Sequence, residues 1–145
     1  MSDELLQSDE FFSFLTGKVS TAISRRLQRN LKLAKLNITS EQWTILYHLW
    51  QEEGLTQQEL ANLTFRDKPS ITRLINNLEK ISLVIRVNDK QDRRSNLIYL
   101  TKEGRKLKEE GMKQSTITLN EAVAGLNLEE RNYALPPCCR FVEEC

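Results

Sequence analysis

The most constraining feature of this sequence is a pair of helix-capping signals that stand close together, at Thr56 and Asp67. Thr56 is followed three residues later by Glu59, which is the pattern of a capping box, and it predicts a short helix over 57–63. Asp67, with Pro69 in the first turn behind it, predicts the start of a second helix. Two helices joined by so short a turn are typical of a helix-turn-helix unit.

The second helix of this pair is expected to have one apolar face and one polar face. Its apolar face follows from residues at helical spacing, namely Ile71, Leu74, Ile75 and Leu78. The period then changes, because 84–87 and 96–100 are short runs rich in apolar and β-branched residues, separated by a polar and turn-prone stretch. We therefore predict a two-stranded antiparallel hairpin with a charged tip, which is the wing of a winged helix.

Two further helices are predicted before this unit. Apolar residues recur every four positions between 8 and 34, which predicts one long amphipathic helix. A second helix is expected over 42–51, with Thr39 or Ser40 as its cap and with Gly54 as a left-handed residue that ends it. A helix as long as the first usually packs against a partner chain or a second long helix.

The end of the chain is also predicted to be helical. Thr101 can cap a long helix, and a last helix is expected over 128–134, which Pro136 and Pro137 should terminate. The fold class is thus mainly α with a small antiparallel β-hairpin wing, a winged helix-turn-helix flanked by long dimerisation helices. The expected domains are an N-terminal dimerisation helix (1–36), a DNA-binding domain (37–106) and C-terminal dimerisation helices with an atypical Pro/Cys tail (107–145).

The charge of the chain is segregated, although its formal net value at pH 7 is only +1. The stretch 17–35 holds six basic residues and no acidic one, a local charge of +6. The stretch 66–106 holds eleven basic and five acidic residues, again a local charge of +6. Such blocks favour a surface that faces a polyanion, and solvated helix faces are the alternative.

Composition narrows the class of protein further. With 39% hydrophobic and 28% charged residues, the chain is typical of a helical globular protein. No apolar run approaches the roughly 18 residues that span a bilayer, and the acidic N-terminus lacks the pattern of a signal peptide, so we expect a cytoplasmic protein without a membrane partner. The three cysteines lie within the last eight residues, and their odd number and clustering argue against a disulfide framework.

Candidate DNA contacts lie on the polar helix and at the hairpin tip. They are Lys68, Ser70, Thr72, Arg73 and Asn76 on the helix, and Arg93 and Arg94 on the tip. A major groove admits one helix whose hydroxyl, amide and guanidinium groups reach base edges and phosphates. Arginines on a loop can enter a minor groove, and Asp92 is expected to orient one of them by a salt bridge. The alternatives are an ordinary solvated helix face and a solvated turn.

These motifs together resemble the MarR family of transcriptional regulators. The resemblance is carried by Asp67-Lys68-Pro69-Ser70-Ile71-Thr72-Arg73-Leu74-Ile75, Leu78-Glu79-Lys80, Leu83-Val84, Arg86, Asp92-Arg93-Arg94, Leu100-Thr101 and Gly104. It implies a homodimer with interleaved terminal helices that binds a pseudo-palindromic operator in double-stranded DNA. Members commonly repress transcription and release DNA in response to a small-molecule effector or an oxidant.

The resemblance also implies roles for single residues. It places Ser70, Thr72 and Arg73 on the recognition helix, and Arg94 with its two neighbours on the wing. The sequence departs from the family pattern at Ser82, where members usually have glycine; a left-handed serine there would cost about 1 kcal/mol. The second departure is the Pro136-Pro137 pair, which forbids the continuous last helix of the family.

No enzyme site, cofactor site or metal site is expected. His48 is the only histidine, and a packing or surface role suits it better than catalysis. No cysteine or carboxylate cluster has the spacing of a zinc site, and a ligand-binding site cannot be assigned. Trp43, Tyr47 and Trp50 are candidates either for core packing or for lining an effector pocket. The alternative function is a winged-helix protein–protein adaptor without sequence-specific DNA binding.

Overall fold

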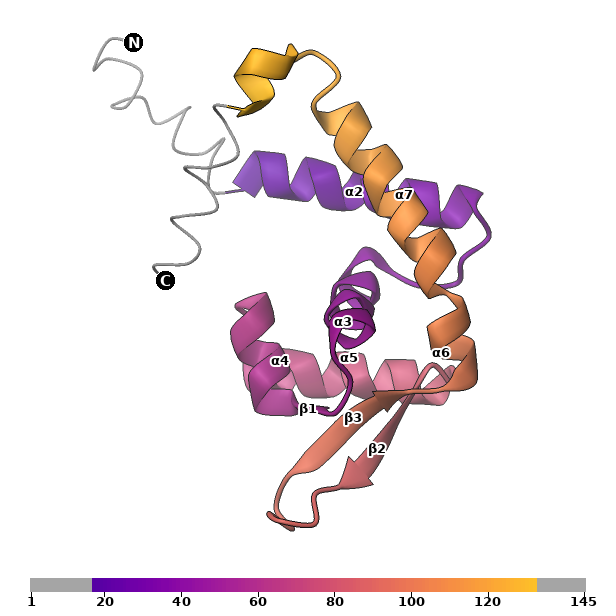
Figure 1. The fold of residues 1–145 in the computed structure, drawn as a ribbon, viewed down its shortest axis with the longest axis vertical. Coiled ribbons are helices and arrows are strands. Elements are labelled where there is room, and N and C mark those ends of the chain that lie inside the picture. Colours follow the sequence, from indigo (N-terminus) through magenta and orange to yellow (C-terminus); the bar gives the residue numbers. More distant parts are fainter. Residues whose placement is uncertain (1–16, 133–145) are drawn as a thin grey trace, which may run out of the picture.

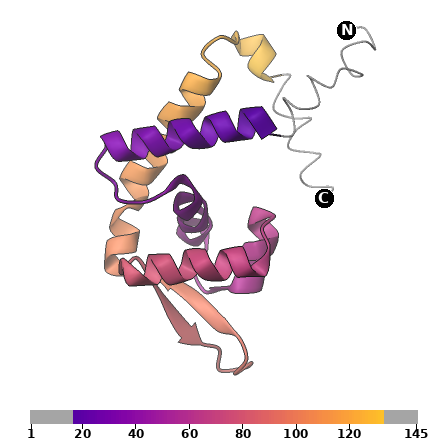
Figure 2. The ribbon, with the colours of Figure 1, turned by 180° about the vertical axis from the view of Figure 1, so that it is seen from behind.

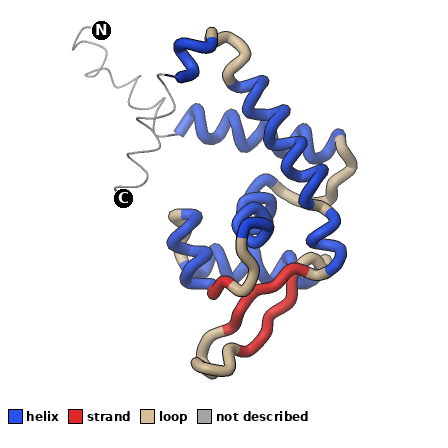
Figure 3. Tube along the Cα trace, in the orientation of Figure 1, coloured by secondary structure: helices blue, strands red, loops and turns tan. Residues whose placement is uncertain are grey.

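The computed structural model describes residues 17–132 of the chain. It is mainly helical with one small antiparallel sheet, which confirms the predicted fold class (Figure 3). The elements in chain order are α2 (Val19–Leu33), α3 (Ser40–Gln51), β1 (Leu55–Thr56), α4 (Gln57–Thr64), α5 (Lys68–Lys80), β2 (Val84–Asn88), β3 (Asn96–Leu100), α6 (Lys102–Lys106) and α7 (Lys108–Ala122).

Helix α3 lies at the centre of the described chain. Figure 1 shows α2 on one side of α3, with α4, α5 and the sheet on the other, and the hairpin of β2 and β3 projecting away from α2. The view from behind shows the same order, with α5 running beside the base of the hairpin (Figure 2). The fully buried apolar side chains that hold these layers together are Leu31, Ile45, Leu46, Leu49, Leu60, Ile71, Ile75, Leu78, Val84 and Ile98.

The capping signals in the sequence correspond to real helix starts. The Thr56 side chain accepts the N–H of Glu59 at 3.1 Å, and the Glu59 carboxylate accepts the N–H of Thr56 at 2.7 Å. The same reciprocal pair joins Thr39 and Gln42 at the start of α3, so Thr39 is the cap there. Asp67 caps α5, with Pro69 inside the first turn as predicted. These short-range signals set the starts of three helices.

The sheet has three strands, whereas the sequence predicted two. Strand β1 adds to the hairpin in the order β1-β3-β2, with Leu55 opposite Ile98. Gly54 stands directly before β1. It does not end α3 as predicted, because the last residue of the helix is Gln51 and its C-cap, Glu52, is already extended. Gly54 does have a left-handed φ of 78°, and its N–H donates to the Ile98 carbonyl at 2.9 Å.

The helix predicted after Thr101 is broken into α6 and α7 at Leu107. The indole N–H of Trp50 donates to the Gly104 carbonyl at 3.0 Å, the oxygen that an unbroken helix would pair with the amide of Lys108. A side chain that takes such a carbonyl interrupts the helical ladder and allows a bend. The break is therefore imposed by a residue far away in the sequence.

The sequence departs from the family pattern at two places, and the structure describes only the first of them. Ser82 adopts the left-handed conformation, with a φ of 61°, as predicted. The Pro136-Pro137 pair, the cysteines and the start of the helix predicted over 8–34 lie outside the described residues. A helical turn does begin at 128, where Asn127 and Glu130 form a reciprocal cap.

Candidate nucleic-acid interface

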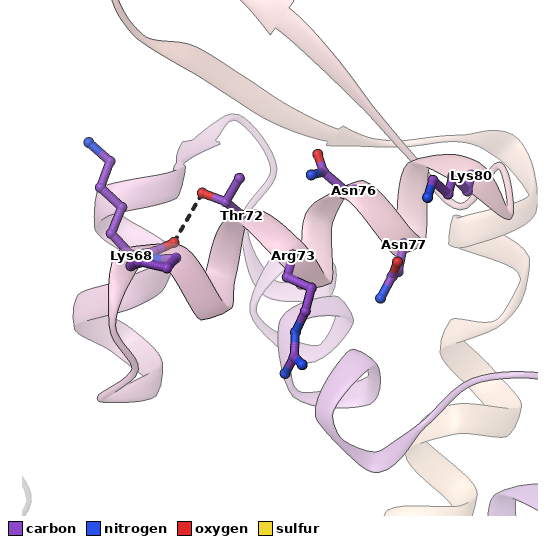
Figure 4. Close-up of a pocket in the computed structure, with 7 residues that line it drawn as sticks. Lys68, Thr72, Arg73, Asn76, Asn77 and Lys80 are labelled. Atoms are coloured by element: carbon purple, nitrogen blue, oxygen red, sulfur yellow. Dashed lines mark hydrogen bonds between the residues drawn. The ribbon is translucent and has the colours of Figure 1, made fainter.

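Helix α5 turns one face to the core and the opposite face to solvent. Its apolar stripe is buried, so the helix is held rigidly against α3, α4 and β2. The outer face forms a shallow, open hollow of about 570 Å³ (Figure 4). The residues that line it are Lys68, Pro69, Thr72, Arg73, Asn76, Asn77 and Lys80.

This hollow brings together four of the five predicted helix residues. Ser70 does not line it; its backbone N–H instead donates to Asp67 at 2.7 Å in the helix cap. This hydrogen bond lowers the pKa of Asp67 and favours the ionised cap. The sequence analysis missed Asn77 and Lys80 as site residues, although they stand four and seven positions after Arg73 and so lie on the same face.

The side chains of the hollow are arranged as hydrogen-bond donors and cations. The Thr72 hydroxyl donates to the Lys68 carbonyl at 3.0 Å, which fixes its rotamer (Figure 4). The Arg73 guanidinium is 70% exposed and lies 4.0 Å from Glu41, too far for a strong ion pair. The Arg73 guanidinium is therefore not held tightly by Glu41, and it stays available to a ligand.

The hairpin carries its cations to the far end of the molecule. β2 and β3 pair in antiparallel register from Val84–Leu100 to Asn88–Asn96, and Arg93 and Arg94 lie exposed in the loop between them. The predicted salt bridge from Asp92 is absent among the ion pairs of residues 17–132. Asp92 instead accepts the backbone N–H of Arg94 at 3.0 Å and the Ser95 hydroxyl at 3.1 Å.

The physical reason for this correction is local. A carboxylate in a tight turn is satisfied by the amide two residues on, which costs less side-chain entropy than fixing a long guanidinium. Asp92 therefore shapes the loop backbone. Both arginine side chains remain free of a carboxylate within the described chain.

The comparisons with known proteins agree on one family. The MarR family model matches residues 38–95, which contain the capped helices and the hairpin. Over these residues the chain matches the MarR family. It is 36% identical over 93 residues to the organic hydroperoxide resistance transcriptional regulator of Bacillus subtilis (strain 168), covering 63% of each chain.

Further relatives are regulators of the same type. The HTH-type transcriptional regulator TtmR of Methylorubrum extorquens (strain PA1) is 36% identical over 110 residues, covering 76% of this chain and 55% of the relative. In both curated relatives the match spans less than two thirds of the relative's own length. The crystal structure of an S. aureus MepR–DNA complex superposes with a TM-score of 0.80 at 29% identity, covering 92% of this chain and 98% of that one.

Within this MarR fold, Arg86 is a site residue that the sequence analysis placed only in the family pattern. It lies on β2, and its guanidinium donates to Asn76 Oδ1 at 2.6 Å and to Glu79 at 3.1 Å. Arg86 thereby joins α5 to the hairpin. Because the amide oxygen of Asn76 accepts from Arg86, its NH₂ group is the part left to donate to a ligand.

Trp43 and Trp50 pack between α3 and the helices that follow the hairpin. The indole N–H groups of Trp43 and Trp50 donate to the carbonyls of Gly111 and Gly104, which ties α3 to α6 and α7. Burial lowers the pKa of His48, as expected for a packed histidine that carries no charge at neutral pH. None of the described residues form a cluster suited to a metal ion, and none of the described helices is long and apolar enough to cross a membrane.

Proposed function

We propose that this chain is a sequence-specific DNA-binding transcriptional regulator that binds a pseudo-palindromic operator as a cytoplasmic homodimer. One observation carries the proposal. Lys68, Thr72, Arg73, Asn76, Asn77 and Lys80 form one donor-rich stripe on the outer face of α5, beside a hairpin whose exposed tip carries Arg93 and Arg94. The DNA complex of the MepR relative supports the same use of the fold.

The two parts of this surface, α5 and the hairpin, would contact DNA in different ways. Helix α5 would enter the major groove, where Arg73 can recognise guanine and the Asn76 NH₂ group can donate to a base edge. The wing would reach phosphates or the adjacent minor groove, where Arg94 contributes affinity and reads groove width. The Arg86 link keeps the two elements at a fixed distance, so both can engage at once.

The homodimer is supported by apolar side chains that the described chain leaves exposed. Leu33 at the end of α2 is 70% exposed, Leu119 on α7 is 57% exposed and Leu128 is 74% exposed. Such residues on neighbouring helices are typical of a surface that a second copy covers. Repression, with release by a small-molecule effector, is proposed from the family resemblance.

The first test is the salt dependence of DNA binding. If a dimer contacts about 6 to 10 phosphates, log K should fall with log salt at a slope of roughly −5 to −9. Fluorescence anisotropy with a labelled duplex between 50 mM and 300 mM salt would measure the slope. A slope near zero would contradict the proposal and favour a protein–protein adaptor.

The second test separates affinity from sequence reading. Arg94→Ala should weaken binding about equally to selected and to random duplexes, because the wing contacts the backbone and groove. Arg73→Ala should weaken binding to the selected duplex by about tenfold or more and to the random duplex much less, since one base contact contributes about 1–3 kcal/mol. Lys113→Ala removes one exposed charge from α7 and is the matched control. If Arg73→Ala weakened both duplexes equally, α5 would not be the sequence-reading element.

A further inference from the structure

Helix α2 carries a stripe of cations that the winged face does not account for. Lys18, Arg25, Arg29 and Lys32 are all exposed, and their spacings of seven, four and three residues place them on one side of the helix. We call these four residues the α2 stripe. The buried residues Leu27, Asn30 and Leu31 lie on the opposite side of α2, so the stripe faces away from the core.

The α2 stripe has no acidic partner within residues 17–132. None of its four cations is in an ion pair or a side-chain hydrogen bond there. The neighbouring Arg26, by contrast, pairs with Glu121 of α7 at 3.0 Å. Like charges three or four residues apart destabilise a helix slightly. The repulsion between the stripe cations therefore destabilises α2 slightly, and a bound anion would offset that repulsion.

The position of the α2 stripe separates it from the winged face. Both ribbon views show α3 between α2 and α5, and the hairpin projects on the side away from α2 (Figures 1 and 2). A straight duplex held by α5 and the wing would therefore not pass along the outer side of α2. A polyanion that contacts the α2 stripe would therefore be a second one.

The geometry of the α2 stripe points to a phosphate backbone. Fourteen residues of helix extend about 21 Å, and one DNA strand advances about 3.4 Å per phosphate along its axis, so the stripe is as long as about six nucleotides. Arginine forks bind phosphate oxygens in pairs. We propose that the α2 stripe binds the phosphate backbone of a second segment of double-stranded DNA, without sequence preference.

An acidic protein partner fits the α2 stripe less well. Protein interfaces have centres that are poor in charge and rich in apolar and aromatic anchors. The exposed residues between the stripe cations are small or polar, such as Thr21 and Ala22, and Leu33, at the end of α2, is the large apolar residue exposed beside them. One apolar side chain at the end of the stripe is a poor anchor for a protein partner, whereas a phosphate backbone requires none.

The test compares two triple variants of the full chain. The stripe variant carries Arg25→Gln, Arg29→Gln and Lys32→Gln, and the control variant carries Lys102→Gln, Lys106→Gln and Lys113→Gln on α6 and α7. Each removes three exposed positive charges. Both sets are also placed in a chain with Arg73→Ala and Arg94→Ala, which weakens the winged face. Binding to a labelled 30-bp duplex of random sequence is measured by anisotropy, and light scattering gives the number of chains.

In the weakened background, the stripe variant should lose at least tenfold in affinity, and its salt slope should become shallower by about 3, because each phosphate contact contributes about 0.9. The control variant should lose less than threefold. Equal losses in the two variants would overturn the proposal. A change in the number of chains in the stripe variant would assign the stripe to a subunit contact and overturn it also. Polyglutamate binding as tight as that of the duplex, and lost in the stripe variant, would assign the stripe to an acidic protein instead.

This inference does not depend on the proposed function. If Arg73→Ala and Arg94→Ala leave DNA binding unchanged, the proposed role of the winged face fails. The stripe and control variants can then still be compared in the otherwise unsubstituted chain.

Discussion

The winged region and the α2–α7 pair are held together in opposite ways. Between α3 and β3 the interior is apolar, and side chains such as Ile45, Ile75 and Ile98 are fully buried. In α7 the buried residues are Gly111, which lies against Trp50 of α3, and Gln114 and Thr118, none of them a large apolar residue. The winged region is thus complete within one chain.

The α2–α7 pair replaces apolar packing with polar links. Asn30 donates to the Thr118 hydroxyl at 2.9 Å, and Arg26 pairs with Glu121 one turn further on. Leu27 and Leu31 of α2 are buried, but other large apolar residues of the two helices, such as Leu33 and Leu119, remain exposed. This difference indicates that the winged region carries the stability of the single chain, and that the helical pair is built for a further contact.

The largest expected effect comes from the core of the winged region. Ile75→Ala should lower the free energy of unfolding by about 3 kcal/mol, because it removes a fully buried side chain and leaves a cavity. Ile81→Ala makes the same change at a side chain that is 45% exposed, and it should cost less than about 1 kcal/mol. Urea denaturation measures both. Equal losses would show that the winged core is not the source of stability.

A smaller effect is expected at the polar link between α2 and α7. Asn30→Ala should cost about 1–2 kcal/mol, because Asn30 is buried and loses its hydrogen bond to Thr118. Combined with Thr118→Val in a double-mutant cycle, the coupling energy should be about 1 kcal/mol. Thr118→Ser keeps the hydroxyl and is the control. Strictly additive losses would mean that this hydrogen bond does not stabilise the crossing.

Ser82 offers a substitution that should stabilise the winged region. Its left-handed φ of 61° strains any residue with a Cβ atom, so Ser82→Gly should raise the free energy of unfolding by up to about 1 kcal/mol. Ser82→Ala keeps the strain and should bring no gain. Thermal denaturation of the two variants distinguishes them. A gain with alanine as large as with glycine would refute the backbone explanation.

The smallest effect is expected at Glu53, which links the loop after α3 to β3 and α6. Its carboxylate accepts two hydrogen bonds from the Arg105 guanidinium and one from the N–H of Leu100. The hydrogen bonds from Arg105, aided by that from Leu100, hold the pKa of Glu53 below its ordinary value of 4.5, against a partial burial that raises it. A lowered carboxyl pKa stabilises the fold fully above the ordinary value, and this stabilisation is lost as the pH falls through the folded-state pKa.

The matching measurement is the melting temperature as a function of pH. Glu53→Gln should lower it at pH 6, and the difference from the wild type should shrink below pH 4.5, where the ionised carboxylate begins to be lost. The shift should be small, because the Arg105 side chain is 55% exposed. Glu52→Gln is the control, because Glu52 is exposed and its side chain has no hydrogen bond or ion pair among the described residues. A Glu53→Gln difference that stays constant from pH 6 to pH 3 would contradict the assignment.

The same comparison shows what a sequence can predict. The winged region was predicted well because its helix starts depend on residues three positions apart, as at Thr56 and Asp67. Strand β1 was missed because two residues carry no periodicity and depend on pairing with β3. The break between α6 and α7 was missed because Trp50, which stands 54 positions before Gly104, takes a carbonyl from the helix.

The candidate site likewise has residues that could be predicted from the sequence and contacts that could not. Asn77 and Lys80 could have been predicted, since helical spacing alone places them beside Arg73. The hydrogen bond from Arg86 to Asn76 could not, because it depends on how β2 packs against α5. Asp92 was predicted to form a salt bridge and instead accepts the backbone N–H of Arg94. This also could not be predicted, because it depends on the turn geometry of the loop.

The central claim is that the winged face of this chain reads a DNA sequence as a homodimer. The most direct measurement is selection of bound duplexes from a random pool with purified protein whose chain number is known from light scattering, followed by sequencing. We predict a pseudo-palindrome whose half-sites lie about one helical turn, or about 10 base pairs, apart. A dimeric preparation that binds the pool but enriches no motif would contradict the claim.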